Sequence, residues 1–308
     1  MNNKFEEQLY QLMTKDKIHK GELLSKHTTF KIGGPADYFL MPSNKEEVQS
    51  VIRLCREYHM PFYIMGNGSN LLVGDKGYRG VMIQLYKNYQ GITLEKKDDN
   101  HMHFTAGAGV LLSALANEAA KQSCTGFEFA SGIPGTLGGA VTMNAGAYGG
   151  EMKDCIEQSV LLDGNGNIVT LKKEQLELGY RSSIIQKKSY IVLEASFIFE
   201  KGNQTEIYDK MKELNQKRRE KQPLEYPSAG STFKRPEGYF AGKLIMDAGL
   251  KGYRVGDAMV SEKHCGFVVN AGKATAADVK TLMKEVDRIV YEKSGVHLEP
   301  EVRMIGEF

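Results

Sequence analysis

The sequence predicts an α+β protein built from three modest lobes. Strand-like runs alternate with helix-like ones in the first part, and short strands separated by turn clusters such as KKDDN and DGNGN dominate residues 92–199. A charged helical run and the Pro-containing stretch QPLEYPSAG then open a third region. At 308 residues the chain exceeds what one small core usually organises. We expect domains over 1–85, 86–203 and 204–308, and leave open a return of the final strand to the first lobes.

The first domain is expected to hold three strands and a helix, over 36–41, 62–65 and 81–85 for the strands and from Ser43 to before Pro61 for the helix. Ser43 and Glu46 match a capping box. The apolar residues that follow repeat at helical spacing: Val48, Ile52 and Cys55. The opening region is therefore α/β in character.

Further helices are predicted over 111–121 and 205–221, and a third begins at Thr275. Thr275 and Asp278 form a capping-box-like start, and Gly295 is the expected stop. The face between them is apolar: Val279, Leu282, Met283, Val286, Ile289 and Val290. The closing segment EPEVRMIG is a strand candidate.

Composition narrows the function classes. With 40 Lys and Arg against 38 Asp and Glu, the net charge of +2 gives no global basic excess, so we expect no nucleic-acid partner. The N-terminus lacks the apolar core of a signal peptide, and no stretch is long enough to span a bilayer, so we expect a cytoplasmic protein without a membrane partner.

The cysteines and histidines give little chemistry. The four cysteines contain no CxxC pair and are interpreted as buried reduced thiols. His101 and His103 lie on one side of a predicted strand without a third ligand, so no metal is expected. His264 and Cys265 are predicted to be adjacent strand residues, whose side chains point to opposite faces and do not easily pair as nucleophile and base.

Two glycine-rich segments suggest a large anionic cofactor. In YIMGNGSNLLV a strand leads into a tight loop whose backbone amides can face a pyrophosphate; its residues are Gly66, Asn67, Gly68, Ser69 and Asn70. In ASGIPGTLGGAVTMNAGAYGGE, over 130–151, glycines alternate with small residues, and four become cofactor-binding candidates: Gly132, Gly135, Gly138 and Gly139. A simple turn and a glycine-rich crossing between sheets are the alternatives.

Three residues are candidates for chemistry. Arg181 in GYRSS carries a planar fork suited to a carboxylate. Ser231 in SAGSTFKRP offers a hydroxyl, and Glu301 in EPEVR offers a carboxyl group. The alternative interpretations are an arginine on the surface, a hydroxyl in a turn and a carboxylate in solvent.

Taken in order, the segments resemble the family of UDP-N-acetylenolpyruvoylglucosamine reductases. The resemblance covers most of the chain and rests on motifs in the family's order: TTFKIGGPADYF, GNGSNLL, SGIPGTLGGAVTMNAGAYGGE, YRSS, AGSTFKRP, AGKLI, DAGLKG and EPEVRMIG. It implies a two-lobe FAD-binding module of the vanillyl-alcohol-oxidase type with a C-terminal α+β substrate-binding domain. It also implies an enzyme of peptidoglycan precursor synthesis.

The resemblance implies a mechanism as well. NADPH reduces a non-covalent FAD, and the flavin then passes hydride to the enolpyruvyl ether of a UDP-sugar. Arg181 and a protonated Glu301 support the charge that develops on the substrate carboxylate, and Ser231 supplies a proton to the neighbouring carbon.

The chain fits the family's shorter subgroup, because no tyrosine-bearing loop insertion can be placed in it. Lys221 in RREK and Arg235 in KRP are expected substrate contacts, with plain surface charge as their alternative. Two other functions stay open, namely another FAD-dependent oxidase or dehydrogenase on the same scaffold and a non-catalytic nucleotide-binding protein.

Overall fold

The computed structural model describes residues 3–308 and divides the chain into two compact units. Unit 1 comprises the chain up to His19, Phe39–Asn67 and Val81–Arg218, and unit 2 comprises Lys20–Tyr38, Gly68–Gly80 and Arg219–Phe308. Each unit is therefore assembled from segments that are distant in the sequence. The three-domain division expected from the sequence stays a prediction.

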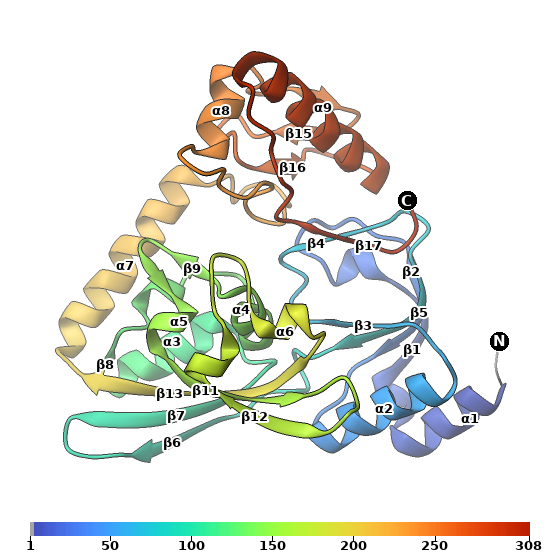
Figure 1. Ribbon diagram of the computed structural model, residues 1–308, viewed down its shortest axis with the longest axis vertical. Helices are drawn as coiled ribbons and strands as arrows, with labels where there is room; N and C mark the ends of the chain where they lie inside the picture. Colours follow the sequence, from blue (N-terminus) through green and yellow to red (C-terminus); the bar gives the residue numbers. More distant parts are fainter. Residues whose placement is uncertain (1–2) are drawn as a thin grey trace. The chain divides into compact units, whose positions relative to one another are not determined.

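The main sheet of unit 1 has six strands in the order β12-β11-β13-β7-β6, and β8 also pairs with β13 (Figure 1). All its pairings are antiparallel. The strands are β6 (Ile92–Lys96), β7 (His101–Gly107), β8 (Cys124–Thr125), β11 (Ile156–Leu162), β12 (Ile168–Lys172) and β13 (Ile191–Lys201). A cluster of aromatic rings packs on it: Phe104, Phe127, Phe197 and Phe199. This sheet confirms the sheet-rich middle region.

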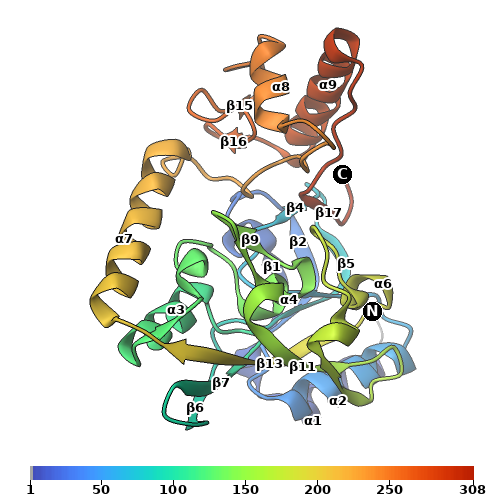
Figure 2. The ribbon, with the colours of Figure 1, turned by 60° about the vertical axis from the view of Figure 1, so that its left-hand side comes forward.

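Short helices lie between these strands in the sequence, and α4 packs against β13. They are α3 (Leu112–Lys121), α4 (Leu137–Met143), α5 (Met152–Cys155) and α6 (Ile184–Lys187), together with the hairpin β9 (Gly146–Ala147) and β10 (Gly150–Glu151). The long helix α7 (Gln204–Lys221) follows directly on β13 (Figure 2). The predicted helices over 111–121 and 205–221 are confirmed to within one residue.

Unit 1 also holds α1 (Asn3–Leu12) and α2 (Lys45–Glu57), and the start of α2 corrects a prediction. The N-cap is Asn44, whose side chain accepts a hydrogen bond from Glu47 N at 2.8 Å, so the cap expected at Ser43 with Glu46 is wrong by one position. Ser43 N instead donates to the Glu47 carboxylate at 2.8 Å. The expected apolar stripe of α2 is confirmed, because Val48, Ile52 and Cys55 are buried.

A four-stranded sheet has the order β1-β2-β5-β3, with β3 and β5 parallel. Its strands are β1 (Ile18–Leu23), β2 (Pro35–Leu40), β3 (Phe62–Met65) and β5 (Tyr78–Gln84). The division into units passes through β1, β2 and β5. The three strands predicted here are confirmed, although β5 begins three residues earlier than expected. Single 3-10 turns occur at Lys15–Lys17, Leu24–Lys26, Glu128–Ala130 and Lys173–Leu176.

Unit 2 contains a three-stranded antiparallel sheet, two helices and a parallel strand pair. The sheet is β14 (Arg254–Val255), β15 (Ala258–Val260) and β16 (Val268–Asn270), the helices are α8 (Ala241–Asp247) and α9 (Ala276–Ser294), and the pair is β4 (Leu71–Val73) with β17 (Arg303–Ile305). Helix α9 has the predicted capping box of Thr275 and Asp278 and ends at Gly295. The observed final strand, β17, is shorter than the predicted segment EPEVRMIG.

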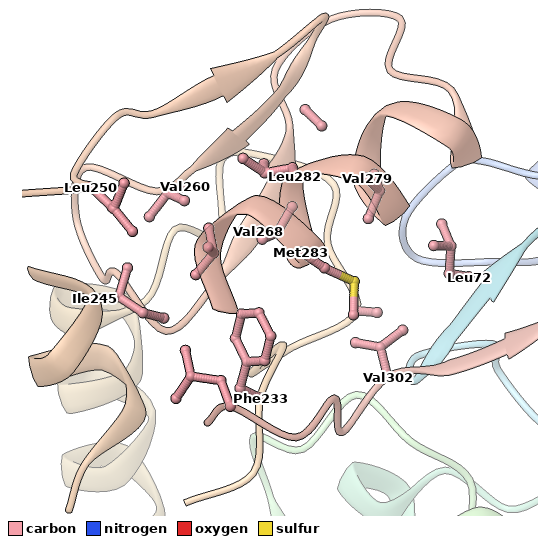
Figure 3. Close-up of a cluster of buried hydrophobic side chains, with 14 of the residues drawn as sticks. Leu72, Phe233, Ile245, Leu250, Val260, Val268, Val279, Leu282, Met283 and Val302 are labelled. Atoms are coloured by element: carbon pink, nitrogen blue, oxygen red, sulfur yellow. The ribbon is translucent and has the colours of Figure 1, made fainter. Parts of the chain in front are cut away.

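The core of unit 2 draws side chains from both ends of the sequence. Figure 3 shows Leu72 and Val302 in one cluster with Val279 and Met283 of α9. Phe30 and Ile32 belong to the same cluster and are almost fully buried. The segment Lys20–Tyr38 is therefore a structural part of unit 2.

Candidate active site

The first half of the predicted pyrophosphate loop lies in unit 1. A Cβ at Gly66 would lie 2.0 Å from Thr136 Oγ1, so only glycine fits there. The Asn67 amide donates to Pro134 O at 2.8 Å. The structure thus brings the GNGSN loop against the start of the second glycine-rich segment, which the sequence alone did not indicate.

The second half of the loop lies in unit 2. Gly68 has a φ of +65°, and a Cβ there would lie 2.2 Å from His27 O. The Asn70 amide donates to Glu301 O at 3.3 Å, and Asn70 O accepts from Arg303 N at 3.0 Å. Asn70 therefore holds the segment that carries Glu301 and leads into β17.

The backbone of this loop suits an anion. Across residues 3–308, the N–H groups of Asn67, Gly68 and Ser69 donate to no protein acceptor. Consecutive N–H groups without partners are typical of loops that bind phosphate. The residues present therefore fit the pyrophosphate of FAD.

The second glycine-rich segment includes α4, a helix that the sequence did not predict, and its glycines differ in purpose. A Cβ at Gly138 would meet Ala108 Cβ at 2.9 Å, and one at Gly132 would meet Asn215 Oδ1 at 2.6 Å. Both glycines serve close packing inside the unit. A Cβ at Gly139 would meet nothing within 4 Å. The face at Gly139 is open and fits a flat cofactor, while Gly135 O accepts from Leu112 N at 3.1 Å.

Arg181 lies in unit 1 at the tip of a two-residue turn. Gly179 and Ser182 form an isolated antiparallel bridge with N···O distances of 3.0 and 3.2 Å, and Tyr180 and Arg181 connect them. Arg181 has a φ of 51°, an uncommon conformation for a non-glycine residue. Its Cζ lies 5.1 Å from the centre of the Tyr180 ring. The sequence predicted the residue but not this turn.

Ser231 and Glu301 are brought together in unit 2 on adjacent antiparallel segments. Glu301 N donates to Thr232 O at 2.8 Å, and Phe233 pairs with Pro300. Thr232 is buried and held by two hydrogen bonds of 2.8 Å. Its N–H donates to Gly266 O, and its Oγ1 accepts from Val268 N. Ser231 is exposed, and its hydroxyl has no hydrogen-bond partner in the part of the chain that the structure describes. The two backbone segments are adjacent, and a hydroxyl without a protein partner can donate to a bound substrate.

The two expected substrate contacts also belong to unit 2. Lys221 is exposed at the end of α7. Arg235 is exposed, and its Cζ lies 4.5 Å from the centre of the Phe240 ring, which is itself 60% exposed. Their roles stay predictions.

Arg218 is a candidate that the sequence reasoning missed. Burial lowers the pKa of its guanidinium, and within residues 3–308 it has no acceptor. Its Cδ lies 3.2 Å from the Cβ position of Gly132. A poorly solvated arginine beside a glycine-rich segment fits a phosphate group. The sequence feature that could have identified Arg218 is the charged run KRREK, which also contains the predicted substrate contact Lys221.

The remaining sequence candidates carry no chemistry in the structure. All four cysteines are free. Three are buried as predicted, and Cys155 is half-buried. His101 and His103 pair with Asp98 and Glu157. His264 and Cys265 lie in a turn, so their expected strand is wrong; the His264 ring accepts from Gly266 N at 3.1 Å.

Two kinds of feature are absent from residues 3–308. No three His, Cys, Asp or Glu side chains are grouped to hold a metal ion. No helix in this range has the length and apolarity needed to cross a membrane.

Comparison with known proteins gives two family matches. A UDP-N-acetylenolpyruvoylglucosamine reductase C-terminal domain model matches residues 222–305, and an FAD binding domain model matches residues 36–172. A relative from Lachnoclostridium phytofermentans named UDP-N-acetylenolpyruvoylglucosamine reductase is 59% identical over 100% of this chain and 99% of its own.

Solved structures agree with these matches. The crystal structure of UDP-N-acetylenolpyruvylglucosamine reductase from Thermus caldophilus has a TM-score of 0.77 at 38% identity, covering 93% of this chain and 98% of that one. An alkyldihydroxyacetonephosphate synthase has a TM-score of 0.50 at 16% identity, covering 65% of this chain and 41% of that one. At that identity the second likeness concerns the fold alone.

Proposed function

Because the chain belongs to the UDP-N-acetylenolpyruvoylglucosamine reductase family, we propose that NADPH supplies its hydride and that Arg181, Ser231 and Glu301 are its catalytic residues. The chain is an FAD-dependent oxidoreductase that reduces the enolpyruvyl group of a UDP-sugar in peptidoglycan synthesis. The fold class expected from the sequence is thereby confirmed. The cytoplasmic location and the lack of nucleic-acid or membrane partners stay predictions.

Bound FAD would take up hydride from the nicotinamide and deliver it to the enolpyruvyl carbon. We assign its pyrophosphate to the loop from Gly66 to Asn70, whose free N–H groups and tight glycines suit it. The open face of Gly139 is assigned to the same cofactor. Neither glycine-rich segment contains a histidine or cysteine, so binding is expected to be non-covalent.

One observation supports the catalytic assignment most directly. Hydrogen bonding between Glu301 N and Thr232 O places the Ser231 and Glu301 segments side by side, although 70 positions of sequence separate the residues. Addition of hydride leaves negative charge on the substrate carboxylate and its neighbouring carbon. A carboxyl group and a hydroxyl on adjacent segments can stabilise that charge and return a proton to the carbon.

Arg181 supplies the fixed positive charge in this proposal. Its guanidinium carries a positive charge and offers a planar fork to a carboxylate. The bridge between Gly179 and Ser182 closes the turn on which Arg181 lies. Such preorganisation is what transition-state stabilisation requires.

The two half-reactions can be measured separately. We expect NADPH to bleach the flavin of Ser231→Ala at the rate of the parent protein, because that step needs no proton from the serine. Reoxidation by the UDP-enolpyruvyl sugar without oxygen should slow by about 100-fold, as for loss of a positioned acid. Rapid-mixing absorbance of the flavin follows both steps.

Ser228→Ala is the matched control, since it removes a hydroxyl from the same segment at a position for which we propose no chemistry. Normal reoxidation of Ser231→Ala would show that the Ser231 hydroxyl has only a structural role. Reoxidation by oxygen but not by the sugar in the parent protein would favour another flavin oxidase, and no flavin reduction by NADPH would remove the proposed donor.

A further inference from the structure

Asn144 is a fully buried polar residue at the end of α4, with 0% of its surface exposed. Its backbone is left-handed, with φ 43° and ψ 55°. Asparagine tolerates this conformation better than most residues, but burying its amide is costly unless hydrogen bonds compensate. Its side chain therefore needs a structural or functional reason.

The Asn144 amide joins the end of α4 to two other segments of unit 1. Its nitrogen donates to Gly179 O and to Glu151 Oε2, both at 3.0 Å. Its oxygen accepts from Lys153 N at 2.9 Å. Both amide hydrogens and the carbonyl are thus used, and they link the end of α4 to the turn at Gly179 and to the segment of Glu151 and Lys153.

One of these contacts supports the turn of Arg181. Gly179 O accepts from Ser182 N across the turn and from Asn144, so the base of the turn is held from two sides. The preceding turn of α4 also contributes, because Thr142 O accepts from Ser183 Oγ at 2.7 Å and from Gln186 Nε2 at 2.8 Å. An uncommon backbone conformation such as that of Arg181 persists only where its surroundings fix it.

The other contact orients a carboxylate near Arg181. Glu151 forms an ion pair with Lys153 at 2.9 Å. The pKa of Glu151 is lowered by Lys153, by the Asn144 hydrogen bond and by the charge of Arg181, while partial burial opposes them. Asn144 therefore governs both the turn that presents the guanidinium and the negative charge beside it.

We propose that Asn144 is a positioning residue for Arg181, holding its turn through Gly179 and its neighbouring carboxylate through Glu151. The inference rests on the catalytic role proposed for Arg181. Asn144 itself contacts no reacting atom in this scheme. Its effect on the reaction should therefore disappear when the Arg181 side chain is absent.

The test uses Asn144→Asp in the flavin-bound enzyme. This change keeps the shape of the side chain and the acceptor for Lys153 N, but it replaces the donor to Gly179 O and faces Glu151 with a second negative charge. We expect NADPH to reduce the flavin at the normal rate. Reoxidation by the UDP-enolpyruvyl sugar should slow by about tenfold to 100-fold, the range for a displaced catalytic group.

A double-mutant comparison separates positioning from a general structural effect. Arg181→Ala combined with Asn144→Asp should reoxidise no more slowly than Arg181→Ala alone. Asn270→Asp is the matched control, because Asn270 is a buried amide of unit 2 that donates to Phe30 O and accepts from two backbone N–H groups. We expect it to lower thermal stability without slowing reoxidation. If Asn144→Asp loses flavin, Asn144→Gly keeps the left-handed backbone without the added charge and is measured instead.

Normal reoxidation in Asn144→Asp and Asn144→Gly would overturn the inference. So would a slowing that multiplies fully with that of Arg181→Ala, because Asn144 would then act independently of Arg181. Normal reoxidation in Arg181→Ala alone would refute the proposed role of Arg181, a different failure that removes the basis of this inference as well.

Discussion

Replacing Gly139 with alanine tests where the cofactor lies. Gly139 is within α4, and a Cβ there meets no atom within 4 Å outside its own helix. Alanine in a helix is more stable than glycine by about 1 kcal/mol. The free energy of unfolding of the flavin-free protein should therefore rise by up to about 1 kcal/mol in Gly139→Ala.

The same methyl group should weaken FAD binding if the cofactor lies on that open face. Adding a methyl group to a well-packed contact costs about 1 to 3 kcal/mol. The Kd for FAD should then rise by about fivefold to 150-fold. Titrating flavin-free protein with FAD, followed by the quenching of flavin fluorescence, measures the Kd, and urea unfolding measures the stability.

Gly138→Ala is the control, because its Cβ would meet Ala108 Cβ at 2.9 Å and should destabilise the protein even without flavin. The two neighbouring glycines thus differ in which quantity they change. Wild-type FAD affinity in Gly139→Ala would refute the reasoning, and so would a loss of stability in its flavin-free form.

Three further predictions concern the charge and the cofactor. Arg181→Lys keeps the charge but loses the fork, so turnover should fall by roughly 2 kcal/mol of transition-state free energy with little change in KM; a change confined to KM would make Arg181 a ground-state anchor. Acid or heat should release all flavin into the supernatant, and flavin that stays attached to denatured protein would contradict non-covalent binding. The pKa of Glu151 is lowered on folding, so its stabilisation is complete above the unfolded pKa of about 4.3 and is lost as pH falls through the folded value. Glu151→Gln should accordingly show a smaller loss of unfolding free energy than the parent between about pH 5 and pH 3, measured by urea titration, and equal losses would contradict this assignment.

Local signals made the ends of helices predictable. Thr275, Asp278 and Gly295 lie within or beside α9, and their hydrogen bonds join residues only a few positions apart. The sequence pattern was therefore sufficient to predict both ends of the helix. The error at the start of α2 is also local. Ser43 and Asn44 are both good N-caps, and only the backbone geometry selects Asn44.

Tertiary contacts decided what the sequence did not predict. Helix α4 has the sequence LGGAVTM, and two glycines lower its helix propensity. It forms because Leu137 N and Gly138 N donate to Val110 O and Ala108 O at 2.8 Å, and because it packs on β13. No pattern within seven residues reports such partners.

The candidate site shows the same limit. Arg181, Ser231 and Glu301 were identified through motifs, yet the alignment of Ser231 with Glu301 depends on backbone pairing over a long separation. Asn70 was expected to face a cofactor, and its amide contacts Glu301 O across 231 positions. Residue type suggested the chemistry, whereas only the fold revealed which groups support one another.

The strand pair of β4 with β17 has a consequence for synthesis on the ribosome. Leu71–Val73 emerge early, but their partners Arg303–Ile305 are translated more than 200 residues later. At ordinary elongation rates this interval is on the order of ten seconds or more. Phe30 and Leu72, which end fully buried, must spend that time without most of their final neighbours. The nascent chain therefore carries an exposed apolar segment that chaperones can bind until the last strand is made.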